Sequence, residues 1–219
     1  MRKNTERSKG LTVVKQFNSK KNEVYLIKHG AEQYIQKRFN NQELFETEKN
    51  FYLMMIKEEF KTPRLLDYNL SKRELLIEYI ACSTLLDRLE AYEFKQSYDN
   101  AYSLLTQLID YLYRFSQLQY IKSNNLCYYD INFRNFLVDN HQIIGIDFED
   151  IRSGTFVQDA AKTIAMHLFY SPVCSDFKLE VSERLKAYLA ARYQISAAEI
   201  NRLIEEEIKS IKMRRDSRN

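Results

Sequence analysis

The chain has 219 residues, enough to bury a substantial core as one domain or as two small lobes. Its hydrophobic content of 45% and charged content of 29% are typical of a soluble globular protein, and a net charge of +3 is too small on its own to indicate nucleic-acid binding. Three widely spaced cysteines, Cys82, Cys127 and Cys174, fit neither a disulfide framework nor a zinc site. Because the chain has neither a signal peptide nor a membrane-spanning apolar run, we expect a cytoplasmic protein.

The first 80 residues alternate between β-like runs and one helical stretch. Residues 11–17, 23–28 and 33–39 are separated by turn-like residues, which predicts a three-stranded antiparallel meander. A helix is predicted over residues 41–59, with Leu44, Phe45, Tyr52, Met55 and Ile56 on its apolar face. Residues 64–68 and 74–79 are predicted to be two more strands. The expected result is a compact lobe of five strands and one helix.

The rest of the chain is mainly helical. Residues 81–83 are expected to form a crossover, followed by helices over 84–92, 98–120, 158–169, 178–193 and 196–213. The helix over 98–120 is strongly amphipathic. Ser196 followed by Glu199 forms a capping box that marks the start of the last helix.

Three polar residues, Asp130, Asn135 and Asp147, are separated by short apolar runs between Cys127 and Asp150. Residues 136–139 and 143–147 are predicted to form a hairpin with a polar turn at 140–142. A tight hairpin brings its ends together, so we expect Asp147 to lie close to Asn135 and Asp130. Two carboxylates and a carboxamide are oxygen ligands suited to Mg²⁺.

The D-x-x-x-x-N motif of Asp130 and Asn135, followed by Asp147-Phe148, resembles the catalytic and metal-binding loops of the protein-kinase-like superfamily. The resemblance covers residues 11–167 and is strongest to the small-molecule branch of aminoglycoside phosphotransferases and choline kinases. It implies an α+β bilobal protein-kinase-like fold with a small antiparallel five-stranded N-lobe, one helix and a mainly helical C-lobe. Residues 1–80 would be the nucleotide-binding lobe, and residues 81–219 would carry the catalytic loop and the acceptor site.

The resemblance implies a lysine on the third strand, paired with a glutamate from the helix that follows. Alternate residues of a strand share a face, so Lys37 is preferred over Arg38. Glu48 is favoured as its partner because Glu48, Tyr52, Met55 and Ile56 share one helical face, whereas Glu46 points elsewhere. Lys37 would contact the phosphates of ATP, and Glu48 would hold Lys37 in place there.

The resemblance also implies a role for other residues. Glu78 and Ile80 belong to the hinge segment whose backbone holds the adenine edge. Asp130 is the expected catalytic aspartate, and Asn135 and Asp147 are the expected Mg²⁺ ligands. Asp159 is either the buried aspartate that braces the catalytic loop or a simple helix N-terminal residue.

The sequence departs from the family pattern in three places. The loop over residues 18–22 contains no glycine, although Lys20 and Lys21 could contact phosphate directly. Tyr128 and Tyr129 replace the usual histidine and arginine before the catalytic aspartate, and packing is their favoured role. Glu149 replaces the glycine of D-F-G, a substitution common in the small-molecule branch.

Eleven residues separate Asp147 from Asp159, too few for the peptide-docking segment of a protein kinase. We therefore expect an ATP- and Mg²⁺-dependent phosphotransferase acting on a hydroxyl of a small molecule. The acceptor could be a sugar, a lipid-core saccharide or an amino alcohol. It could also be a cationic compound attracted by nearby carboxylates, which are Glu149, Asp150, Asp176, Glu180 and Glu183. The alternatives are an atypical, RIO-like protein kinase and a pseudokinase or binding module. Nucleic acid is not expected as a partner, and no protein partner is indicated.

Overall fold

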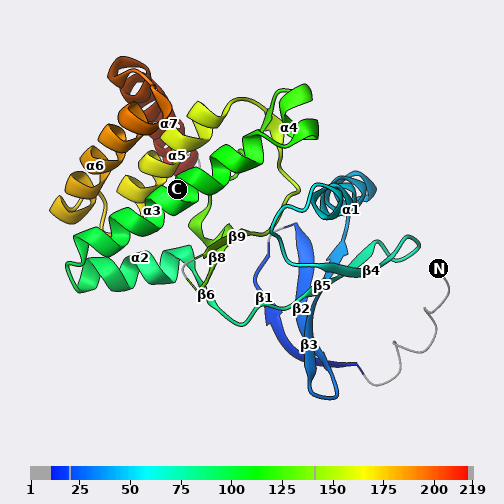
Figure 1. The fold of residues 1–219 in the computed structure, drawn as a ribbon. Helices are drawn as coiled ribbons and strands as arrows, with labels where there is room; N and C mark the ends of the chain where they lie inside the picture. Colours follow the sequence, from blue (N-terminus) through cyan, green and yellow to red (C-terminus); the bar gives the residue numbers. More distant parts are fainter. Residues whose placement is uncertain (1–10, 20, 141, 217–219) are drawn as a thin grey trace. The chain divides into compact units, whose positions relative to one another are not determined.

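A computed structural model describes residues 11–19, 21–140 and 142–216, and the chain in it folds into two compact units. Unit 1 contains residues 1–81 and the separate segment 145–149, whereas unit 2 contains residues 82–144 and 150–219. The sequence assigned residues 145–149 to the second lobe, but in the structure they pack with the first. Figure 1 labels the helices and strands of the two units.

Unit 1 is built on a five-stranded antiparallel sheet with the strand order β1-β2-β3-β5-β4. The predicted meander is confirmed: β1 (Thr12–Phe17) pairs with β2 (Asn22–His29), and β2 pairs with β3 (Glu32–Phe39). The turn between β2 and β3 uses Gly30 at φ +61°, a backbone conformation that favours glycine. Strands β4 (Leu65–Asn69) and β5 (Glu74–Glu78) complete the sheet.

Helix α1 (Gln42–Lys57) begins where the Asn41 side chain accepts hydrogen bonds from two backbone N–H groups of the first turn. Its buried apolar side chains are Phe45, Phe51, Tyr52 and Met55. The prediction that Ile56 faces inward is wrong, since 53% of this side chain is exposed. Ile56 lies one turn after the buried Tyr52 on the same side of the helix, but it belongs to the last turn of α1, which ends at Lys57.

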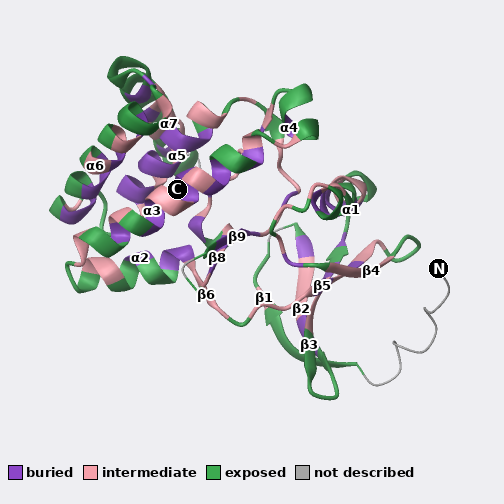
Figure 2. Cartoon of the chain, in the orientation of Figure 1, coloured by how far each residue is buried: buried purple, intermediate pink, exposed green. Residues whose placement is uncertain are grey.

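Unit 2 is mainly helical, with helices α2 (Leu85–Phe94), α3 (Tyr98–Ser116), α5 (Phe156–Phe169), α6 (Asp176–Tyr193) and α7 (Ala197–Asp216). Helix α5 packs against α3, α6 and α7, and Figure 2 shows it buried over most of its surface. The predicted cap of the last helix is present, because the Glu199 N–H donates to the Ser196 hydroxyl. None of the described helices combines the length and apolar content needed to cross a membrane.

The prediction of one continuous helix over residues 98–120 is wrong about where the helix ends. Helix α3 ends at Ser116, and a separate short helix, α4 (Gln119–Ser123), follows an extended residue, Leu118. The Ser116 hydroxyl donates to the Tyr113 carbonyl at 2.7 Å, and such local bonds compete with the helical ladder.

The predicted hairpin is confirmed as β8 (Phe136–Asp139) and β9 (Gln142–Gly145), but β9 ends two residues before Asp147. These strands form a three-stranded sheet with β6 (Ser83–Thr84), in the segment predicted as a crossover. A second small sheet, also not predicted, joins β7 (Leu126–Cys127) to β10 (Arg152–Ser153). Strands of two residues carry no readable periodicity, so the sequence could not reveal them.

Candidate active site

Lys37 on β3 is the centre of the charged cluster in unit 1. Its side chain is buried, and its Nζ donates to Glu48 Oε2 at 2.6 Å and to Asp147 Oδ1 at 2.8 Å. A third carboxylate, that of Glu149, lies 3.3 Å away. Arg38 points outward and pairs with Glu74 and Glu23, as the alternation of the strand predicted.

Helix α1 supplies Glu48, whose side chain is almost fully buried. The choice of Glu48 over Glu46 as the partner of Lys37 is confirmed, since Glu46 instead pairs with Lys49 on the same helix. A buried charge is costly unless it is paired, and the Lys37–Glu48 contact meets that requirement in unit 1.

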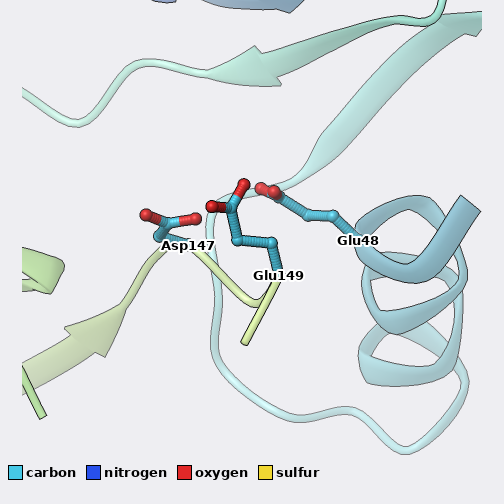
Figure 3. Close-up of side chains that lie close together, drawn as sticks. All are labelled: Glu48, Asp147 and Glu149. Carbon is cyan, nitrogen blue, oxygen red and sulfur yellow. The ribbon is translucent and has the colours of Figure 1, made fainter. Parts of the chain in front are cut away.

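Asp147 and Glu149 reach the cluster from the segment after β9. Phe148 between them is fully buried and packs edge-on against Tyr52 of α1, with ring centroids 5.4 Å apart. Asp147 has φ +66°, a conformation that costs energy for a residue other than glycine and is common at functional sites. Figure 3 shows the carboxylates of Glu48, Asp147 and Glu149 gathered together.

The cluster carries more negative than positive charge. Burial lowers the pKa of Lys37, but the carboxylates of Glu48, Asp147 and Glu149 outweigh burial and leave this pKa raised. Burial also raises the pKa of Glu48 to about 7, with Lys37 opposing the shift and the other two carboxylates adding to it. One oxygen atom from each of the three carboxylates lies within 4.8 Å of the other two. This donor set fits a hard divalent cation such as Mg²⁺, which would relieve the excess charge.

The glycine-free loop is tied to this cluster through Glu149. Asn22 Nδ2 donates to Glu149 Oε2 at 2.5 Å, and Lys21 Nζ lies 3.2 Å from Glu149 Oε1. Lys21, which immediately precedes β2 and was predicted to contact phosphate, thus pairs with the Glu149 carboxylate. Lys20, the other predicted phosphate contact, lies outside the described residues.

The predicted hinge residues lie at the end of β5. The Glu78 carboxylate forms a two-pronged ion pair with Arg64, and the Glu78 N–H donates to the Arg64 carbonyl at 2.9 Å. Ile80 follows the strand and is half-buried. The Glu78 N–H is therefore already used within the sheet, and the adenine-binding role of this segment stays a prediction.

The predicted catalytic loop lies in unit 2. Asn135 Nδ2 donates to Asp130 Oδ2 at 2.9 Å, so the expected proximity of these two residues is confirmed. A short 3-10 turn, Phe133–Asn135, brings the amide back to the carboxylate, and Asn132 caps that turn by accepting from the Arg134 N–H. The predicted proximity of Asp147 to this pair stays a prediction, because Asp147 belongs to unit 1.

Asp159 of α5 braces the same loop. Its buried carboxylate accepts from the Tyr128 N–H at 2.7 Å and the Tyr129 N–H at 3.0 Å. Burial raises the pKa of Asp159 to about 6, although the two backbone hydrogen bonds act in the opposite direction. The helix itself is capped by Thr155 in a capping box with Gln158. Of the two readings of Asp159, the geometry therefore supports the brace.

The two tyrosines before Asp130 differ in their burial and in what they contact. Tyr128 is fully buried and packs against Phe115 and Phe136, as favoured by the sequence. Tyr129 is half-buried, lies at φ +64°, and lines a pocket on unit 2.

The fold is protein-kinase-like, with a five-stranded antiparallel sheet and one helix in unit 1 and a mainly helical unit 2. The predicted fold class is therefore confirmed. No protein-family model and no curated protein matches the chain.

Two solved structures illustrate the likeness. The kinase PK-1 of the Cydia pomonella granulovirus has a TM-score of 0.52 and 17% identity, over 84% of this chain and 71% of that one. The aminoglycoside phosphotransferase APH(4)-Ia, solved as a thermostable mutant with ADP and hygromycin B, has a TM-score of 0.57 and 11% identity, over 88% of this chain and 84% of that one. At these identities the likeness establishes the fold.

Sequence reasoning missed the role of Glu149 within unit 1. The sequence predicts Glu149 as a substitution for glycine and as a carboxylate that could attract a cationic acceptor, whereas in the structure it contacts Lys37, Lys21 and Asn22. The available signal was its spacing from Asp147, with the apolar Phe148 between two carboxylates. Such spacing suggests that the two carboxylates lie on the same side of the segment, but it does not indicate which lysines they contact.

Proposed function

We propose that the protein is a phosphotransferase that moves the γ-phosphoryl group of ATP to a hydroxyl group of a small molecule. The observation that carries the proposal is the buried contact of Lys37 with Glu48 and Asp147. A lysine held in this way suits the phosphates of a nucleotide, and phosphoryl transfer depends mainly on positioning and charge stabilisation. The braced loop with Asp130 supports the same reaction.

In the proposed transfer, the acceptor hydroxyl oxygen forms a bond to the γ-phosphorus. The bond between that phosphorus and the oxygen bridging it to the β-phosphate breaks, and ADP leaves. The hydroxyl proton passes to the carboxylate of Asp130, which Asn135 holds through its hydrogen bond. Asp159 keeps the backbone of the loop in place through the two N–H groups that it binds.

Lys37 would hold the phosphates, with Glu48 fixing its position. Asp147 and Asn135 are the proposed ligands of Mg²⁺, and Glu149 offers a further carboxylate. When bound, the cation would neutralise charge on the β- and γ-phosphates. Glu78 and Ile80 are proposed to contact the adenine through their remaining backbone groups.

The short segment before α5 supports a small acceptor. Residues 148–158 include the two-residue strand β10 and the cap of α5, and these features use most of the segment. A peptide-docking platform of the protein-kinase type needs a longer segment. The aminoglycoside phosphotransferase among the structural neighbours was solved with ADP and hygromycin B, which is consistent with this acceptor class.

The test is ADP release from Mg·ATP in the presence of a panel of hydroxylated metabolites. We expect turnover with at least one acceptor, reduced by about 100-fold or more in Asp130→Ala, because a general base contributes at least that much. Asp99→Ala, at an exposed position on α3, is the matched control and should retain full activity.

Two other outcomes identify the alternatives. Phosphate incorporated into the chain itself or into an added protein, with no small-molecule turnover, would indicate an atypical protein kinase. Absence of any Mg·ATP-dependent rise in melting temperature, together with absence of turnover, would rule out the phosphotransferase and favour a binding module.

A further inference from the structure

A pocket of about 220 Å³ lies on unit 2 beside the catalytic loop, and the proposed reaction does not otherwise use it. One wall comes from Cys127 and Tyr129, immediately before Asp130, and another from Ser153 of β10. Gln158 and Lys162 line it from the first turns of α5. The pocket has room for a small substituent, but not for a nucleotide.

Lys162 is the prominent charge in this pocket. Its Nζ donates to the Tyr129 carbonyl at 3.2 Å and lies 3.3 Å from the centroid of the Tyr129 ring. Arg152 lies against the same ring, with its guanidinium carbon 4.4 Å from the centroid. The face of an aromatic ring attracts cations, so Tyr129 holds both cations beside the loop.

The carboxylates near the pocket already have partners. Glu206 and Glu207 of α7 line it, but they form ion pairs with Arg202 at 2.6 Å and Arg214 at 2.8 Å. Asp150 pairs with Arg152 at 2.6 Å.

Two further ionisable groups adjoin Lys162. Asp159 is buried and accepts from two backbone N–H groups, and it also attracts Lys162. Burial raises the pKa of the Cys127 thiol to about 12, so this group is neutral.

The carboxylates considered for a cationic acceptor are engaged or lie elsewhere. Asp150 pairs with Arg152, and Glu183 pairs with Lys186 on α6. Glu149 belongs to the Lys37 cluster of unit 1. Among the charged residues that line the pocket, Glu206 and Glu207 are paired with arginines, so the charge left to meet an acceptor is that of Lys162. This charge is positive, the opposite of what a cationic acceptor needs.

We propose that this pocket binds an anionic group of the acceptor, a phosphate or a carboxylate on a hydroxylated compound, with Lys162 as the main contact and Arg152 as a second cation. Ser153 and Gln158 add neutral hydrogen-bonding groups to the lining. The inference rests on the proposed phosphotransferase function, for which it names the acceptor class. Tyr129, which occupies the arginine position of many protein kinases, would be the platform that positions both cations.

The binding test uses the full-length protein without nucleotide, so that its result does not depend on catalysis. Amide NMR shifts are recorded with glycerol 3-phosphate and gluconate as anionic probes, glycerol as the neutral probe and ethanolamine as the cationic probe. We expect the anionic probes to shift the signals of Tyr129, Ser153 and Lys162, with glycerol and ethanolamine leaving them in place. The two anionic probes distinguish phosphate from carboxylate recognition.

Lys162→Gln should weaken binding of the effective probe by about tenfold, since a charge-assisted hydrogen bond contributes that much. Lys186→Gln, on α6 and outside the pocket lining, is the matched control and should bind as the parent protein does. Should Lys162→Gln fail to fold, Arg152→Gln at an exposed position tests the same charge and should weaken binding by a smaller factor.

Equal binding by the Lys162 and Lys186 variants, or larger shifts with ethanolamine than with the anions, would overturn the inference. So would turnover confined to cationic acceptors, and that result would leave the phosphotransferase proposal standing. Conversely, a protein that binds the anions at Lys162 but shows no Mg·ATP binding would refute the phosphotransferase alone.

Discussion

The Lys37 cluster of unit 1 shows how single residues acquire properties that their neighbours in the chain lack. Lys37 and Arg38 are adjacent cations, yet the first is buried among three carboxylates and the second pairs at the surface. The difference follows from strand alternation, which places consecutive side chains on opposite faces. Substituting each residue in turn should therefore distinguish the loss of the buried Lys37 cation from the loss of a positive charge at the surface of the same strand.

Lys37→Met should abolish the rise in melting temperature that Mg·ATP produces, because it removes the cation proposed to hold the phosphates. Arg38→Met, one residue away on the opposite face, should retain that rise. The measurement is thermal unfolding with and without Mg·ATP, after each variant is shown to be folded by circular dichroism. Equal nucleotide responses in the two variants would contradict the assignment of Lys37.

Stabilisation by Mg²⁺ alone should increase with pH. The pKa of Glu48 is about 7, so near pH 5.5 this carboxyl group retains its proton, and by pH 8 it is ionised and available to offset the charge of a cation. Thermal unfolding with and without Mg²⁺ at the two pH values measures the effect. Glu48→Gln should flatten the pH dependence, whereas Glu46→Gln should not, and a Mg²⁺ effect that falls with pH would contradict the prediction.

At the scale of elements, α5 organises unit 2. It packs against three other helices and also supplies the brace of the catalytic loop. One of its buried residues is His167, whose Nε2 has no hydrogen-bond partner among the described residues. Burial, with a contribution from Lys178 of α6, lowers the pKa of His167 to about 3.

His167 should make unit 2 sensitive to acid. The unfolded chain takes up this proton near pH 6.5, whereas the folded chain does so near pH 3, so the stability that neutral His167 contributes is present above pH 6.5 and lost as the pH falls toward 3. His167→Leu should remove up to about 3 kcal/mol of the stability lost between pH 7 and pH 4. Urea unfolding at several pH values measures this loss.

His29→Leu, at an exposed position on β2, is the control for that experiment and should leave the acid sensitivity unchanged. A His167 variant that loses stability on acidification as steeply as the parent protein would show that other groups are responsible.

At the scale of the whole molecule, the chain does not divide at a single point. It leaves unit 1 after Ala81, returns to it for residues 145–149, and then continues in unit 2. The returning segment carries Asp147, Phe148 and Glu149, and the fully buried ring of Phe148 packs against Tyr52 of α1 in unit 1. Unit 1 therefore depends on residues that are distant in sequence for part of its core and two of the carboxylates around Lys37.

Phe148→Ala should destabilise the protein by about 3–5 kcal/mol, the usual cost of truncating a buried phenylalanine. Phe94→Ala, at a side chain that is 90% exposed, should change stability by no more than about 0.5 kcal/mol. Denaturant unfolding gives both values, and hydrogen exchange should show the loss of protection in β3, β5 and α1. A loss confined to unit 2 would contradict the assignment of Phe148 to the core of unit 1.

Local pattern in the sequence was sufficient for much of the fold. Alternation along residues 33–39 predicted which side of β3 carries Lys37, and helical periodicity selected Glu48 over Glu46. The D-x-x-x-x-N motif and the hairpin after it predicted that Asp130 and Asn135 lie together, and the two residues are only five positions apart. These features depend on neighbours within a few residues, and such neighbours are encoded directly in the order of the chain.

Only the tertiary structure decided the contacts between distant segments. The contact of Glu149 with Lys37 joins residues 112 positions apart, and Lys162 meets Tyr129 across 33 positions. The break at Leu118 and the two-residue strands β6, β7 and β10 also have no periodic signal. Periodicity specifies which face of an element is buried, but not which element will cover it. The sequence alone thus determined the longer strands, most of the helices and the proximity of Asp130 to Asn135. Folding determined which charges meet around Lys37 and Tyr129, because those charges come together only when separate elements pack.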